Sequence, residues 1–141
     1  MLRLSKRYPF SASHRLHSSE LSEQENARLF GKCNNPFGHG HNYVLEVGVC
    51  GEADPESGML LPRAELDRLV RKAVLDKVDH ANLNTDVAGM RGLVPTTENL
   101  ALVIGRWLRE AWEMEFDGRP VRLDRVRIEE TARNTFEVTY G

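Results

Sequence analysis

The sequence has little cysteine, no long apolar run and no marked excess of charge of either sign. Its two cysteines are too few for the disulfide framework of a small secreted domain, so we expect free thiols. The longest uninterrupted apolar stretch, residues 100–104, is much shorter than the roughly 20 residues of a membrane-spanning helix. A formal net charge of −2 gives no electrostatic reason to expect a nucleic acid or an anionic membrane as a partner. The amino terminus lacks the continuous apolar segment of a secretion signal, and we therefore expect a cytoplasmic protein.

What the sequence does contain fits one folded unit. Its 141 residues, 40% of them hydrophobic and 28% charged, match the commonest domain size and can bury one core. No repeat or low-complexity segment interrupts them. We therefore predict a single domain over residues 1–141.

Apolar periodicity predicts four strands and two long helices. The predicted elements, in chain order, are strands at 1–13 and 41–50, helices that begin near Pro62 and at Thr96 or Thr97, and strands through 126–128 and 136–140. Ser22 and Glu25 have the spacing of a capping box and predict a short helix within an insertion. The long elements follow the order β, β, α, α, β, β, which predicts an α+β fold with antiparallel hairpins and two helices on one side of the sheet.

The sharpest local motif is His39-Gly40-His41. Residues two apart on a strand point to the same side, so both imidazoles can bind one metal ion. His14, at the end of the first predicted strand, is a plausible third ligand, and three protein ligands are typical of catalytic zinc. The alternative is an ordinary sequence that leads from a loop into a strand, with imidazoles that hydrogen-bond or titrate at the surface.

Cys33 precedes this motif by a loop rich in turn-forming residues. The loop can fold back and bring the thiol beside the metal without making it a ligand. A nearby cation would lower the pKa of the thiol and favour the thiolate. The alternative for Cys33 is a partly buried, inert thiol, which is also how we interpret Cys50.

Asp79 and His80 place a carboxylate beside an imidazole directly after the first long helix. Adjacent residues rarely hydrogen-bond to each other, so a proton relay would need a third group that both side chains reach. The alternative is a pair of polar residues at the carboxyl end of a helix, where histidine is favourable in any case.

Glu130 shares the two-residue period of Val126 and Ile128, so it faces the apolar side of its strand. A carboxylate turned inward needs a partner. Two parallel hydrogen bonds from the N–H edge of a heterocycle would supply one. Alternatively, the strand ends before Glu130 and leaves the side chain in water.

Five segments line up in order with one family: FSASHRL at 10–16, CNNPFGHGHNY at 33–43, LDKVDHANLN at 75–84, PTTEN at 95–99 and ET at 130–131. The chain resembles the 6-pyruvoyl-tetrahydropterin synthases over nearly its whole length. The resemblance implies the tunnelling fold, or T-fold, in which an antiparallel four-stranded sheet carries two helices on one face. In this family the subunits form barrels that stack as hexamers, with active sites between subunits.

The same resemblance assigns roles to the motif residues. It implies one Zn²⁺ per chain, held by three histidines: His14, His39 and His41. It implies three residues that transfer protons: Cys33, Asp79 and His80. It also implies four residues that bind the pterin: Thr96, Thr97, Glu98 and Glu130.

The family reaction converts 7,8-dihydroneopterin triphosphate to 6-pyruvoyl-tetrahydropterin and releases triphosphate without an external redox cofactor. The resemblance leaves open whether Mg²⁺ accompanies the triphosphate. A related branch, the 6-carboxy-tetrahydropterin synthases of queuosine biosynthesis, uses the same substrate and nearly the same residues. The spacing of Cys33 from His39 and the insertion over 18–30 favour the pyruvoyl-forming branch. A third alternative is a pterin-binding module without catalysis, against which the joint presence of Cys33, Asp79 and His80 argues.

Overall fold

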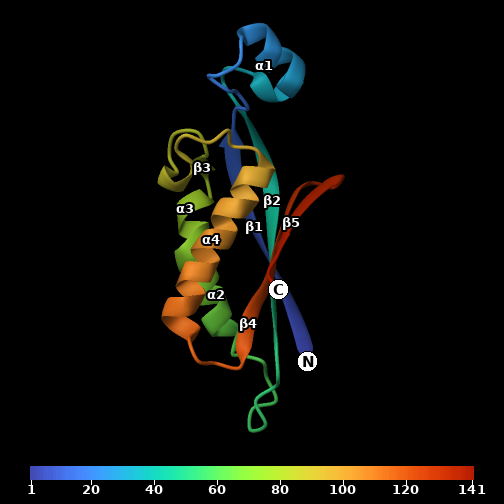
Figure 1. Ribbon diagram of the computed structural model, residues 1–141, viewed down its shortest axis with the longest axis vertical. Coiled ribbons are helices and arrows are strands. Elements are labelled where there is room, and N and C mark those ends of the chain that lie inside the picture. Colours follow the sequence, from blue (N-terminus) through green and yellow to red (C-terminus); the bar gives the residue numbers. More distant parts are fainter.

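The computed structural model describes residues 1–141 and contains one five-stranded sheet with the strand order β3-β1-β2-β4-β5 (Figure 1). Four of the strands are antiparallel to their long neighbours: β1 (Leu2–His14), β2 (His39–Gly51), β4 (Val121–Thr131) and β5 (Asn134–Thr139). The fifth, β3 (Ala81–Asn82), pairs with β1 in parallel.

The long helices cover one face of this sheet, and a short helix stands apart at one end (Figure 1). The first long helical run consists of α2 (Arg63–Val70), a π-helical turn over Arg71–Leu75 and α3 (Asp76–Val78). The second is α4 (Thr97–Phe116). The short helix is α1 (Glu23–Phe30), which a 3₁₀ turn over Gly31–Asn34 follows directly, and a further 3₁₀ turn spans Ala88–Met90. None of these helices combines the length and the apolar character that a bilayer crossing requires.

Sequence periodicity explains how the core forms between the helices and the sheet. On β2, alternate residues such as Tyr43, Leu45 and Val47 are fully buried. Leu100, Ile104 and Leu108 form the matching buried stripe of α4. The β1–β2 pairing runs without a bulge from Leu2 opposite Gly51 to His14 opposite His39.

The predicted α+β architecture is confirmed, with four long antiparallel strands and the long helices on one face. The capping box of α1 is present in both directions, and Thr96 is the N-cap of α4. One difference is β3, which lies between the two long helical segments, where the apolar periodicity predicted no strand. A two-residue strand cannot show a two-residue period, and it forms because the chain returns beside β1 after α3. The barrel of subunits stays a prediction.

Candidate functional site

Three imidazoles meet where the β1–β2 ladder ends. His14 lies directly opposite His39, and His41 lies opposite Ala12 on the next rung that faces the core. The ring centroids of the three histidines are 4.7 to 5.1 Å apart. The ladder therefore brings the predicted metal ligands together within a single chain.

The nitrogen atoms of this triad suit a metal ion. His14 Nδ1 lies 2.8 Å from the Pro95 carbonyl oxygen, to which it can only donate, so the lone pair of the imidazole is on Nε2. His14 Nε2 is buried and has no hydrogen-bond partner. His39 Nε2 and His41 Nε2 are 2.9 Å apart, and one candidate ligand atom from each histidine lies within 4.8 Å of the others. Three such nitrogens, none with a hydrogen-bond partner outside the triad, match the ligand set of a catalytic zinc site.

The protonation state of the triad favours metal binding as well. Burial lowers the pKa of His14, and the neighbouring imidazoles lower it further, against the effect of the Pro95 carbonyl. Burial and His41 also lower the pKa of His39. Both rings are thus biased toward the neutral form, which is the form that coordinates metal.

Glu130 lies beside the triad. The Thr97 hydroxyl donates to Glu130 Oε2, and Glu130 Oε1 is 3.9 Å from His41 Nε2. The side chain of Glu130 is 17% exposed. Glu130 lies where the register of the β4–β5 pairing shifts, between Glu129 and Thr131. Glu130 is therefore turned inward, within reach of a ligand that binds next to the histidine triad.

The remaining residues of the predicted pterin-binding segment are placed differently. Thr96 uses its side chain to cap α4 by accepting from the Asn99 N–H. Glu98 is exposed in the first turn of α4, where its carboxylate forms neither a hydrogen bond nor an ion pair. Of this segment, only Thr97 has a side chain that contacts the Glu130 carboxylate in the chain.

Cys33 lies in the 3₁₀ turn that returns from the insertion, and hydrogen bonds to the backbone of Leu16 fix its position. The Leu16 N–H donates to the Cys33 carbonyl oxygen at 2.7 Å, and Asn34 Nδ2 donates to the Leu16 carbonyl oxygen at 2.7 Å. Burial raises the pKa of the Cys33 thiol, and the charge of Glu130 raises it further. This direction applies to the protein without a cation. The lower pKa that we predicted from the sequence depends on the positive charge of a bound metal.

Asp79 and His80 lie at the outer edge of β1, away from the triad. Asp79 Oδ1 accepts from the Ser11 N–H at 2.9 Å, and the His80 N–H donates to the Ser11 carbonyl oxygen at 2.6 Å. His80 Nε2 is 3.7 Å from Asp79 Oδ2, closer than we expected for adjacent residues. The reason is the left-handed backbone of His80, whose φ of 60° turns its ring back toward the carboxylate.

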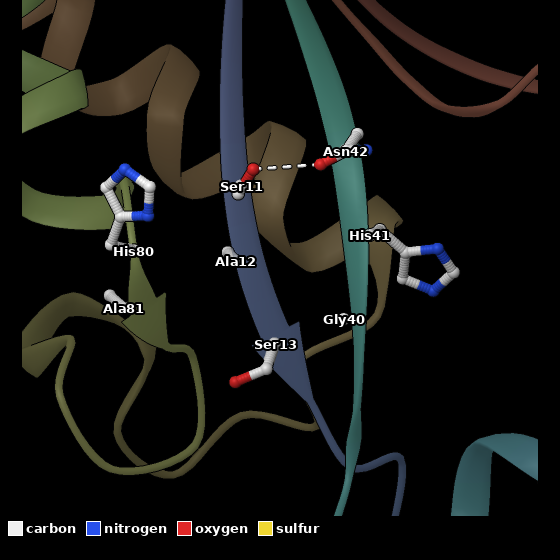
Figure 2. Close-up of a pocket in the computed structure, with 8 residues that line it drawn as sticks. All are labelled: Ser11, Ala12, Ser13, Gly40, His41, Asn42, His80 and Ala81. Atoms are coloured by element: carbon white, nitrogen blue, oxygen red, sulfur yellow. Dashed lines mark hydrogen bonds between the residues drawn. The ribbon is translucent and has the colours of Figure 1, made fainter.

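The two groups of predicted site residues do not converge in one chain. Figure 2 shows His41 and His80 on opposite flanks of the β1–β2 pair, with the Ser11 Oγ hydrogen bond to Asn42 Oδ1 between them. The His80 side chain is 83% exposed, whereas His14 is 1% exposed. The triad with Glu130 forms one cluster, and Asp79 with His80 forms another on a different surface.

Sequence reasoning missed three groups that shape this region. Ser11 holds Asp79 through its backbone, and the Pro95 carbonyl orients His14; backbone contacts of this kind leave no signature in side-chain identity. Tyr43 was interpreted only as a core residue of its strand. It shares the strand period of His39 and His41, which is a signal that its side chain is on the same side as the triad. Burial raises the pKa of the Tyr43 hydroxyl, as do Glu130 and Cys33.

Comparisons with known proteins identify the family of this chain. A sequence model of the family described as 6-pyruvoyl tetrahydropterin synthase matches residues 3–140. The chain therefore belongs to the 6-pyruvoyl tetrahydropterin synthase family. It is 46% identical over 132 residues to the human 6-pyruvoyl tetrahydrobiopterin synthase, covering 93% of this chain and 86% of the human protein.

The solved structure of the Caenorhabditis elegans 6-pyruvoyl tetrahydropterin synthase has the same fold. It superposes with a TM-score of 0.89 at 42% identity and covers 99% of this chain and 96% of that chain. The 6-carboxy-5,6,7,8-tetrahydropterin synthase of Haemophilus influenzae is more distant, at 31% identity over 84 residues, or 57% of this chain and 51% of that protein. The superposition thus confirms the predicted T-fold for the single subunit of this chain.

Proposed function

We propose that the protein is a zinc-dependent 6-pyruvoyl-tetrahydropterin synthase that converts 7,8-dihydroneopterin triphosphate to 6-pyruvoyl-tetrahydropterin and triphosphate. The observation that carries this proposal is the cluster of the three histidines with the inward carboxylate of Glu130. One part of the cluster suits a metal, and the other suits the N–H edge of a pterin. Membership of the synthase family supports the same reaction.

In the proposed site, His14, His39 and His41 hold the zinc ion. When bound, zinc acts as a Lewis acid on an oxygen of the substrate side chain and makes the neighbouring C–H bond more acidic. Pro95 contributes by keeping the His14 proton on Nδ1, so that Nε2 stays available as the ligand.

Glu130 binds the pterin ring in this proposal. A carboxylate accepts two parallel hydrogen bonds from adjacent N–H groups, the pattern along the amidine-like edge of a pterin. Thr97 occupies one lone pair of Oε2, which fixes the rotation of the carboxylate. The pterin ring is thereby oriented, and its side chain is directed toward the histidine triad.

Cys33 removes the carbon-bound proton of the substrate, and Asp79 with His80 returns or relays protons. The hydrogen moves from the side chain to the ring, the triphosphate leaves by elimination, and no electrons enter or leave. A proton on Cys33 has to be lost first, which the raised thiol pKa opposes in the metal-free chain. The positive charge of the metal favours the thiolate instead.

Because the Asp79–His80 pair and the triad lie on different surfaces of the chain, we propose that a working site combines both from two copies. The exposure of His80 suits a residue that acts on a neighbouring subunit. The proposed assembly is a homohexamer of two stacked trimeric barrels, with the open edges of each sheet closed by neighbouring copies.

The pyruvoyl product is favoured over the carboxy product. The synthases of the pyruvoyl branch match nearly the whole chain, whereas the Haemophilus influenzae carboxy-forming enzyme matches little more than half of it. The insertion that we interpreted as a mark of the pyruvoyl branch folds as α1 with its own capping box.

The test uses purified, zinc-loaded protein and 7,8-dihydroneopterin triphosphate, with mass spectrometry of the product and an assay for released triphosphate. We expect stoichiometric 6-pyruvoyl-tetrahydropterin and triphosphate. A 6-carboxy product would assign the protein to the other branch. Binding of the pterin without any triphosphate release would contradict an enzymatic role and support a binding module.

A further inference from the structure

Tyr43 carries a buried polar group that the mechanism above does not use. The residue is 0% exposed, and its hydroxyl has no hydrogen-bond partner of normal geometry. Leaving a buried hydroxyl unpaired typically costs about 1–3 kcal/mol. A phenylalanine at this position would avoid that cost.

The ring and the hydroxyl of Tyr43 lie in different surroundings. The ring stacks on Phe10, with centroids 4.9 Å apart and planes inclined by 11°, so apolar contacts alone hold it in the core. Its centroid is 5.5 Å from that of His41 and 6.4 Å from that of His14. Tyr43 precedes Val44, which pairs with Glu129, so Tyr43 and Glu130 are neighbours on the inward side of the adjacent strands β2 and β4, and the Thr97 hydroxyl donates to Glu130. The polar end of Tyr43 is therefore directed at the pterin side of the triad.

Counting donors and acceptors determines what this hydroxyl can do. Thr97 has one hydroxyl proton, and it donates that proton to Glu130. Toward any other neighbour, the Thr97 oxygen can only accept. Tyr43 has one hydroxyl proton and is neutral at ordinary pH, so it can donate to Thr97. Only one direction of hydrogen bonding is available, from Tyr43 to Thr97 to Glu130.

We propose that Tyr43 is a positioning residue of the pterin site, whose hydroxyl donates to Thr97 and so orients the Glu130 carboxylate for the pterin ring. This inference rests on the proposed function, because it takes Glu130 as the pterin anchor. The Tyr43 hydroxyl is unpaired in the structure, so the proposal requires its hydrogen bond to Thr97 to form when the pterin binds. Hydrogen bonds in such a chain polarise one another, so Tyr43 strengthens the Thr97–Glu130 contact without touching the substrate.

The test compares Tyr43→Phe with Thr97→Val and with the double variant, all loaded with zinc. Binding of the fluorescent pterin neopterin is titrated, and KM and kcat are measured with 7,8-dihydroneopterin triphosphate. We expect Tyr43→Phe to weaken neopterin binding and raise KM by about 3- to 10-fold, the size of one hydrogen bond, with kcat within about twofold of wild type. Because both residues act in the same chain of hydrogen bonds, adding Tyr43→Phe to Thr97→Val should cause no further loss of neopterin affinity.

Tyr8→Phe is the matched control. Tyr8 is also buried on the core face of the sheet, but its hydroxyl donates to Asp67 at 2.7 Å, and Asp67 belongs to α2 rather than to the pterin site. Zinc content and melting temperature are measured for every variant, so that a folding defect is seen directly. Equal neopterin affinity in Tyr43→Phe and Tyr8→Phe would overturn the inference, as would fully additive losses in the double variant.

Failure of the proposed function gives a different pattern. Wild-type protein that binds neopterin but releases no triphosphate contradicts the enzyme, while the affinity ratios still decide the role of Tyr43. Wild-type protein that binds no neopterin contradicts both proposals, since Glu130 is then not a pterin anchor.

Discussion

The predicted site residues lie on two flanks of β1, and the two flanks differ in how deeply these residues are buried and in what holds them. On the core side, His14 is buried, and its neighbours in the ladder fix its position. On the outer edge, Asp79 and His80 are partly or largely exposed and are held through the backbone of Ser11. The difference teaches that residues predicted to act together can lie in two separate clusters of the same chain. In the proposed function, the buried side holds the metal and the pterin, and the exposed side acts on a neighbouring copy.

Loss of one triad ligand gives the largest expected effect. His39→Ala should abolish binding of the single zinc ion, because two imidazoles and no third ligand hold the metal poorly. His80→Ala should keep a full equivalent of zinc, since that ring is on the other flank. Elemental analysis of both purified variants measures the contrast. Full zinc content in His39→Ala would show that the ligand assignment is wrong.

Loss of the proposed base is the next largest effect. Cys33→Ala should reduce turnover by about 100- to 10,000-fold, the usual contribution of a positioned general base. Zinc content and pterin affinity should be retained, because Cys33 is neither a metal ligand nor the pterin anchor in the proposed site. Cys50→Ala is the control, since that thiol is buried elsewhere in β2. Turnover like that of wild type would make Cys33 an inert thiol and leave Asp79 and His80 as the candidate bases.

Mixing two inactive variants tests whether the flanks cooperate between copies. His41→Ala lacks a triad ligand, and His80→Ala lacks the edge imidazole. If one copy supplies the triad and its neighbour supplies the edge, random mixed assemblies should regain about a quarter of wild-type activity, because each site then needs two intact contributions. The measurement is turnover after the variants are dissociated together and reassembled. Activity that stays at the level of the separate variants would contradict a site shared between copies.

The smallest expected effect is on the pH dependence of stability. Burial lowers the pKa of His14 and of His39 in the folded chain. As the pH falls through the ordinary histidine pKa of about 6.5, these histidines become protonated in the unfolded chain but stay neutral in the folded chain. Proton binding therefore stabilises the unfolded state. The metal-free protein should therefore melt at a lower temperature at pH 5.5 than at pH 7.5.

Two variants sharpen this measurement. His14→Gln should reduce the difference in melting temperature between the two pH values, because it removes one of the buried imidazoles. His80→Gln is the control, since the His80 ring stays in water in the folded chain. A pH dependence that His80→Gln changes more than His14→Gln would contradict the assignment to the triad.

The sequence allowed the fold and the buried flank to be predicted because both follow from periodicity. The two-residue period aligned His39 with His41 and turned Glu130 inward, and the 3.6-residue period placed the stripe of α4. The outer flank was less predictable. The contact between Asp79 and His80 depends on one left-handed residue, and β3 is too short to show a pattern. Periodicity assigned Tyr43 to the correct face, but it gives no information about what a hydroxyl meets there.

The rung that joins His14 to His39 closes residues 15–38 into a loop at its base. The entropy cost of closing such a loop grows only with the logarithm of its length, so the part that contains α1 can lengthen or shorten with little effect on the sheet. The returning part is different, because the Leu16 and Asn34 contacts tie Cys33 to the base of the loop. A protein engineer could therefore replace α1 with a new segment or a reporter, provided that the replacement ends before Cys33 and leaves the native sequence intact from there on.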